Sequence, residues 1–226
     1  MGKNYGPRSN ILQGVAGATA IKRSVASGSL RVVGVILTLH ATFALADAAA
    51  PDGIGTCITC HGAHGEGSSA GVPRLAGKNA DYMSHALSMF KAGTRASPIM
   101  QPIARTLSDT EMHGLADFFA TQKAPRVDAG ASASPQLVLA GKQLAEIGAA
   151  NTAPCFSCHA AEGKGNGSRF PSIAAEPARF LIDRLHEFQA RAQGKAPPPG
   201  SMTAVAATLD ESQIEAAAAY LSELEP

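Results

Sequence analysis

The chain has little of several features that would point to other classes of protein. It contains no tryptophan, only 5% aromatic residues and four cysteines in 226 residues, and its formal net charge is +1. Without a basic stripe interleaved with aromatic side chains, nothing indicates nucleic-acid binding. No sustained alternation of apolar and polar residues marks a half-buried strand. The sequence therefore predicts an all-α protein.

An apolar run at residues 32–45 follows a leader with five basic and no acidic residues. It is too short to span a bilayer comfortably, and it ends in Ala44-Leu45-Ala46, a small-x-small cleavage site. We therefore expect a signal peptide at 1–46, with an uncleaved anchor as the alternative. The mature chain would begin near Asp47 in the periplasm with no membrane span. It keeps 14 of the 19 basic residues and all 18 acidic ones, a charge of about −4.

All four cysteines fall in two copies of one pentapeptide. Cys57 and Cys60 precede His61, and Cys155 and Cys158 precede His159, so both motifs are C-x-x-C-H. This pattern is typical of c-type haem attachment, in which each sulfur forms a thioether to a haem vinyl carbon and the histidine becomes an axial iron ligand. Two motifs predict two covalently bound haems.

Other uses of such cysteines are a four-thiolate zinc site and a redox-active dithiol. Neither requires the histidine that directly follows both pairs. Covalent haem attachment in bacteria takes place outside the cytoplasmic membrane, which agrees with the expected signal peptide. For the same reason the cysteines do not indicate a disulfide framework, although that compartment is oxidising.

The two motifs belong to an internal repeat with an offset of 98 residues. The same offset relates further matching pairs: Gly65 and Gly163, Gly67 and Gly165, Pro73 and Pro171, Leu75 and Ile173, Tyr82 and Phe180, Leu87 and Leu185, Phe90 and Phe188. After a net four-residue insertion in the second copy the offset becomes 102, which relates Met100 to Met202 and Leu107 to Leu209. We therefore expect haem-binding domains at 47–122 and 135–226, joined by an exposed linker at 123–134.

Apolar spacing predicts the helices of each copy. One helix is expected around residues 82–90 and another after Ser108, where Ser108 and Glu111 form a capping box. Asp210 and Gln213 predict a similar start in the second copy. The second copy should also have an N-terminal helix over 136–147, with its apolar residues available for packing (Leu137, Leu139, Ala140 and Leu144). In the first copy that helix is expected to be truncated or absent.

The repeat also selects candidate iron ligands. His61 and His159 are the histidines present in both copies, whereas His64, His85, His113 and His186 each correspond to an acid or a serine. Met100 and Met202 are the methionines present in both copies, and each precedes an apolar helix. Met83 and Met112 correspond to Leu181 and Ile214, as core positions would. We expect Met100 and Met202 to supply the second axial ligand of each iron.

With these residues the chain resembles a dihaem cytochrome c of the cytochrome c4 type, two class I cytochrome c domains in tandem. The resemblance implies that Pro73 and Pro171 offer their carbonyls to the ring N–H groups of the two haem histidines. Arg74 resembles a family position near the haem propionates, but the second copy has Ser172 there. The second copy also has Ala160 where the first has Gly62.

Two six-coordinate haems with histidine and methionine ligands would suit single-electron transfer, because they leave no position open to substrate. We therefore expect a carrier rather than an enzyme. Its partners would be redox proteins of a periplasmic chain: a membrane quinol-oxidising complex, a terminal oxidase or a flavoprotein dehydrogenase. The segment 61–65 also resembles the dihaem subunit of flavocytochrome c sulfide dehydrogenase, which is one alternative. A dihaem peroxidase, which needs one open iron, is the other.

Overall fold

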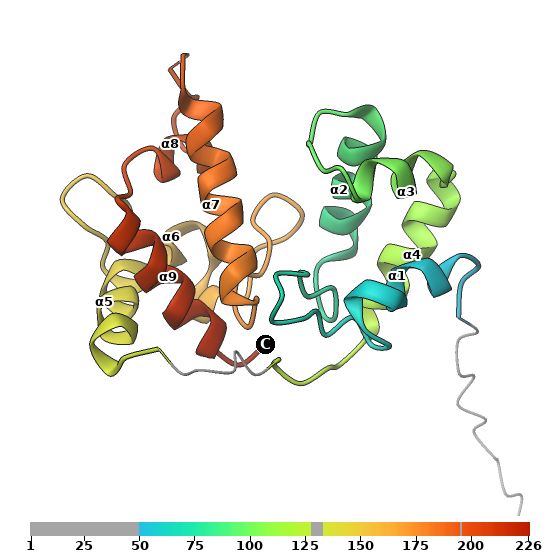
Figure 1. The fold of residues 1–226 in the computed structure, drawn as a ribbon, viewed down its shortest axis with the longest axis horizontal. Coiled ribbons are helices and arrows are strands. Elements are labelled where there is room, and N and C mark those ends of the chain that lie inside the picture. Colours follow the sequence, from blue (N-terminus) through green and yellow to red (C-terminus); the bar gives the residue numbers. More distant parts are fainter. Residues whose placement is uncertain (1–49, 128–132, 195) are drawn as a thin grey trace, which may run out of the picture. The chain divides into compact units, whose positions relative to one another are not determined.

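The computed structural model describes residues 50–127, 133–194 and 196–226. Within them the secondary structure consists of helices and a few isolated β-bridges (Figure 1), which confirms the all-α prediction. The described residues all belong to one compact unit. None of the helices in these described ranges is both long and apolar enough to cross a membrane. The expected signal peptide at 1–46 and the middle of the expected linker lie outside the described residues.

The first half consists of four helices. They are α1 (Ile54–His61), α2 (Ala80–Ala92), α3 (Met100–Thr106) and α4 (Asp109–Thr121). Helix α2 packs against α3 and α4. Met83 from α2 meets Ala116 and Phe119 from α4 in a buried apolar cluster, and Cys57 and Leu75 pack against its edge. The core of this half therefore extends to the C-x-x-C-H motif.

The second half repeats this plan with one helix more. Its elements are α5 (Pro135–Glu146), α6 (Phe156–His159), the 3₁₀ turn η1 (Ala161–Gly163), α7 (Ala178–Ala192), α8 (Met202–Ala206) and α9 (Glu211–Glu223). Helix α9 packs against both α5 and α7. Ala145 of α5, Leu181 of α7 and Leu221 of α9 form a buried cluster, and Cys155 packs against it. Here too the core reaches the motif.

The predicted helix starts are correct because their capping side chains act locally. Ser108 and Glu111 form a reciprocal capping box at the start of α4, and Asp210 and Gln213 do so at α9. In each box the two side chains satisfy backbone N–H groups that the first helical turn leaves free. Gly93 ends α2 in the left-handed conformation, as glycine does at many helix ends.

The N-terminal helix of the second half was placed correctly, but part of its buried face was not. Helix α5 ends one residue before Ile147, and Leu144 is buried as expected. Leu139, however, is 66% exposed. The face toward α9 is formed by Gly141, Leu144 and Ala145, and Leu139 lies five residues from Leu144, more than a third of a turn around the helix. Ala140 is exposed as well, so the predictions that Leu139 and Ala140 pack were wrong.

Candidate haem sites

Each C-x-x-C-H motif lies on a short helix that ends at its histidine. Cys57 and His61 are four residues apart on α1, so one turn brings them to the same face. In the second half, Cys155 is the N-terminal cap of α6 and His159 is its last residue. None of the four cysteines forms a disulfide; Cys60 and Cys158 are exposed, and Cys57 and Cys155 are partly buried. The spacing therefore places one buried histidine beside one exposed and one partly buried cysteine in each half.

The two histidines are held in the same way. His61 is 8% exposed and its Nδ1 donates to the carbonyl oxygen of Pro73 at 2.9 Å. His159 is 5% exposed and its Nδ1 donates to Pro171 at 2.7 Å. The hydrogen bond that the family resemblance implied is thus present in both halves. A neutral imidazole that donates from Nδ1 keeps the lone pair on Nε2 free for a metal.

A tight loop places each proline carbonyl. The carbonyl of His61 accepts from the N–H of Gly67, and that of His159 accepts from the N–H of Gly165, both at 2.8 Å. Both glycines have a left-handed backbone, with φ of 82° and 87°, and a Cβ on either would be 2.6 Å or less from the backbone of the returning strand of the loop. Only glycine suits these positions. The repeated Gly67 and Gly165 therefore support the orientation of the histidines.

The environment favours the neutral form of both imidazoles by lowering their pKa. Burial lowers the pKa of His61, and the Pro73 carbonyl and the Glu176 carboxylate partly oppose this shift. Burial also lowers the pKa of His159, opposed by Pro171 and reinforced by the charge of Lys78. A metal binds the deprotonated nitrogen of histidine, so a lowered pKa favours ligation at neutral pH.

The cysteines do not fit the zinc or dithiol alternatives. In the described part of the chain, which includes all four, no three Cys, His, Asp or Glu residues come together as a metal site. Burial raises the pKa of Cys57, and it raises that of Cys155 to about 11. A reactive dithiol needs a lowered thiol pKa. Cys57 and Cys155 instead lie beside buried apolar clusters.

The surroundings of the motifs fit a large apolar group. Leu75 and Tyr82 in the first half, and Phe156 and Ile173 in the second, are partly buried side chains at the edges of the clusters that touch the motif cysteines. These side chains would hold the apolar part of a haem bound to the motif cysteines. When bound it supplies reversible one-electron chemistry, while the chain supplies the thioether sulfurs, the oriented imidazole and a closed apolar shell.

Met100 and Met202 occupy equivalent positions, each at the first residue of a short helix. Met100 begins α3, where its N–H bonds to the hydroxyl of Ser97, and Met202 begins α8 next to its cap Ser201. Both are partly buried, whereas Met83 and Met112 lie in the core, with 6% and 3% exposure. The short helices are a difference from the sequence prediction, which placed each methionine ahead of a helix. Ligation by Met100 and Met202 remains a prediction.

The other histidines of the repeat lie outside these sites. His64, His85 and His113 are exposed, and His186 is partly exposed and pairs with Glu211 at 2.9 Å. This agrees with their replacement by acidic residues or serine in the other copy.

The side chain of Arg74 is hydrogen-bonded within the protein. It is 4% exposed, and its guanidinium donates to three backbone carbonyls, those of Ala76, Ala124 and Pro125. It thereby attaches the start of the linker to the proline loop. A position of Arg74 near the haem propionates, which the resemblance implied, stays a prediction.

Four charged residues near the sites were missed by sequence reasoning. Lys78 and Glu176 form a buried ion pair, with side-chain exposures of 7% and 2%. Arg95 is 8% exposed and stacks on Phe90, and burial together with the charge of Arg95 lowers the pKa of Arg184. Arg184 also forms an ion pair with Glu187. The repeat offered one signal, because Lys78 and Glu176 are 98 residues apart.

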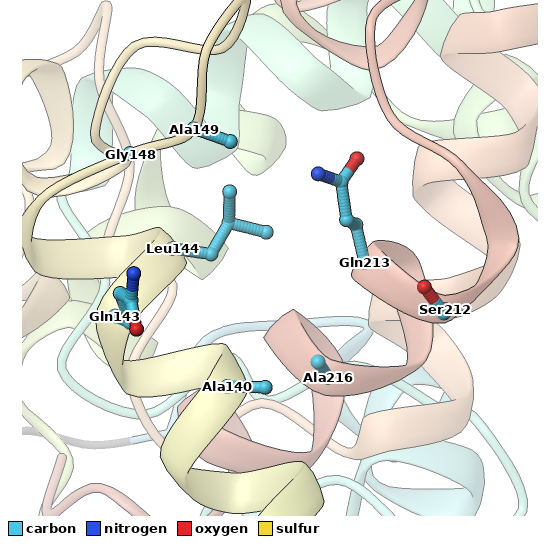
Figure 2. A pocket seen from close by; sticks show the side chains of 8 residues that line it. All are labelled: Ala140, Gln143, Leu144, Gly148, Ala149, Ser212, Gln213 and Ala216. Atoms are coloured by element: carbon cyan, nitrogen blue, oxygen red, sulfur yellow. The ribbon is translucent and has the colours of Figure 1, made fainter.

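A pocket at the crossing of α5 and α9 is separate from these sites. Figure 2 shows Leu144 from α5 and Gln213 from α9 among its lining side chains. The remaining lining residues are Ala140, Gln143, Gly148, Ala149, Ser212 and Ala216. None is a predicted haem residue and none is ionisable, so this pocket is not the haem site.

Two helical units in tandem, each with a C-x-x-C-H helix and a proline carbonyl on the motif histidine, define a protein with two class I c-type cytochrome domains. The cytochrome c family model matches residues 47–123 and 140–225. The chain therefore belongs to the cytochrome c family, and it is a dihaem protein of the cytochrome c4 type with two covalently bound haems c.

The chain is also similar to three particular proteins. The chain is 38% identical to a thiosulfate dehydrogenase electron acceptor from Stutzerimonas stutzeri, over 74% of this chain and 77% of that protein. The cytochrome c4 structure from Acidithiobacillus ferrooxidans is 30% identical with a TM-score of 0.66, covering 75% of this chain and 99% of that one. A thiosulfate dehydrogenase structure from Marichromatium purpuratum matches 74% of this chain with 30% identity and a TM-score of 0.66. The chain spans 36% of that longer protein.

Proposed function

We propose that this protein is a periplasmic electron acceptor for a thiosulfate-oxidising dehydrogenase, from which it passes single electrons to further redox proteins. That it is an electron carrier of the cytochrome c4 type follows from its family. The choice of donor is supported by one observation above others, the 38% identity to a thiosulfate dehydrogenase electron acceptor over three quarters of the chain. The periplasmic location is proposed from the sequence of residues 1–46 and from the place where covalent haem is attached.

The residues of the sites support a carrier over a peroxidase. Both histidines are buried and oriented, and both halves place a methionine at the start of an equivalent short helix. With Met100 and Met202 bound, neither iron would keep a position for peroxide. The protein then contributes little reorganisation when an electron arrives, because the imidazoles are already fixed by carbonyls and packing.

The decisive experiment uses the purified, oxidised holoprotein. It is mixed with thiosulfate and a purified thiosulfate dehydrogenase, and the conversion of ferric to ferrous haem is followed by visible absorption. Both haems should be reduced when enzyme and substrate are present together, and neither should be reduced by thiosulfate alone. Reduction by a quinol-oxidising complex but not by the dehydrogenase would contradict the proposed donor and favour a shuttle toward a terminal oxidase.

Two further measurements separate the alternatives. Reduction by a flavoprotein with sulfide, together with tight co-purification of that flavoprotein, would instead support a sulfide dehydrogenase subunit. Peroxide consumption well above the rate of free haem would support a peroxidase. The mature chain has a charge of about −4, so docking on a basic partner patch should slow as salt rises.

Location can be tested independently. Cell fractionation should place the haem-stained protein in the periplasm, and N-terminal sequencing should begin near Asp47. Intact mass should show the loss of the leader and two haem additions. A protein that keeps its leader in the membrane fraction would contradict this part of the proposal.

A further inference from the structure

The buried ion pair between Lys78 and Glu176 joins the two halves at corresponding positions of the repeat. Lys78 lies five residues after Pro73, and Glu176 lies five residues after Pro171. Their side chains are 7% and 2% exposed. Burying two charges is costly unless further hydrogen bonds satisfy them, and both groups have such bonds. Those bonds lead into the loops that orient the haem histidines.

Glu176 bonds to the peptide group that holds His61. Its Oε2 accepts from the N–H of Arg74 at 3.0 Å. The carbonyl of that same peptide unit belongs to Pro73, and it accepts from Nδ1 of His61 at 2.9 Å. One planar amide therefore links the carboxylate of the second half to the imidazole of the first. Because hydrogen bonds in a chain polarise one another, the carboxylate strengthens the acceptor that His61 uses.

The second half lacks the equivalent bond. Its corresponding peptide joins Pro171, whose carbonyl accepts from His159 at 2.7 Å, to Ser172. The position that could supply a carboxylate to Ser172 is occupied by Lys78, whose ammonium donates instead to the Ser172 carbonyl at 2.8 Å. Within the described ranges, the N–H of Ser172 makes no bond to a carboxylate. The two proline loops match in shape but differ in the charge that contacts them. The loop of the first half is bonded to the carboxylate of Glu176, and the loop of the second half to the ammonium of Lys78.

We propose that Glu176, held by Lys78, is a positioning residue that lowers the reduction potential of the first haem relative to the second. Ferric haem carries one more positive charge than ferrous haem. A stronger hydrogen bond on His61 gives the imidazole more anionic character, which stabilises the ferric state. The nearby carboxylate acts in the same direction. The ion pair would therefore favour the electron on the second haem, whichever partner delivers it.

The test measures the two potentials of the holoprotein by spectroelectrochemical titration. Each potential is assigned to one haem through the NMR signals of the Met100 and Met202 methyl groups in the reduced protein. The variant Met100→Ala identifies the signal that belongs to the first haem. Removing one charge would leave its partner buried and unpaired, so the neutral pair Lys78→Gln with Glu176→Gln is compared with wild type. In the neutral variant the reduction potential of the first haem should rise, and the difference between the two reduction potentials should become smaller.

The charge exchange Lys78→Glu with Glu176→Lys is the sharper variant. It keeps one acid and one base, and the repeat offers them mirrored partners, the N–H of Ser172 for the carboxylate and the carbonyl of Arg74 for the ammonium. The second haem should then have its potential lowered and the first should have it raised. Asp183→Asn, in the exposed pair with Arg179, is the matched control and should leave both potentials unchanged.

The outcomes are distinct. If both double variants keep the wild-type potentials, the ion pair is only structural and the proposal fails. It also fails if the exchange lowers the potential of the first haem. These results are independent of the donor, because no dehydrogenase is present in the titration.

Discussion

Gly141 in α5 lies directly against the backbone carbonyl of Ala216 in α9. A Cβ at residue 141 would be 1.9 Å from that oxygen, far inside contact distance. Helices approach this closely where one of them has no side chain. Because α9 also carries the buried residues around the second motif, the contact fixes the frame of the second haem site.

Gly141→Ala should therefore destabilise the protein. The crossing cannot accept a methyl group without moving α5, and overpacking of this kind costs about 1–3 kcal/mol or more. Gly114→Ala is the matched control, since its nearest neighbour would be Pro51 at 4.0 Å. That change should stabilise by about 0.5–1 kcal/mol through helix propensity. Denaturant unfolding of both variants measures the difference, and equal effects would contradict the close contact.

Met100→Ala and Met202→Ala test the predicted axial ligands. The oxidised protein should show the weak near-infrared band of sulfur-to-iron charge transfer at an intensity for two haems. Each single change should remove about half of it, because each iron would lose one thioether bond. Met83→Leu, at a buried core position, should leave the band intact. An unchanged band in Met202→Ala would show that another group, or none, binds the second iron.

Ala160→Gly should stabilise the second half. Ala160 follows His159 and has φ 61° and ψ 174°, a region that only glycine adopts easily, whereas the first copy has Gly62 there. Relief of this strain should outweigh the greater chain entropy of glycine, with a net gain of about 1 kcal/mol. Ala161→Gly, at a neighbouring position without positive φ, should give no gain. A loss of stability in Ala160→Gly would show that Ala160 is not strained.

The capping box of α4 should make a pH-dependent contribution to the free energy of unfolding. Hydrogen bonds from the hydroxyl and N–H of Ser108 lower the pKa of Glu111 below its ordinary value of 4.5. A lowered carboxyl pKa gives stability that is fully present above pH 4.5 and is lost as the pH falls through the folded value. Wild type should therefore exceed Glu111→Gln in unfolding free energy at pH 7.

At pH 3 that difference should shrink, because the protonated acid and the amide then resemble each other. Denaturant unfolding of the two proteins at both pH values gives the comparison directly. A difference that stays constant with pH would show that the charge of Glu111 makes no contribution.

Local patterns predicted much of the fold. The capping pairs at Ser108 and Asp210 and the stop at Gly93 depend on neighbouring residues, so the sequence placed α4, α9 and the end of α2 correctly. Leu139 was misassigned because an apolar residue on a short helix does not reveal which face its partner covers. The packing of α5 against α9 decides which face of α5 is buried, and that packing depends on the close approach at Gly141.

For the sites, the sequence by itself determined the two haem motifs, and the resemblance to class I domains implied the histidine–proline hydrogen bonds that the structure shows. The tertiary structure alone decided which groups of one half reach the loop of the other. Glu176 meets Arg74 across 102 residues, and the guanidinium of Arg74 faces the linker. Such contacts depend on how separate parts of the chain pack together, and no local pattern of residues encodes that packing.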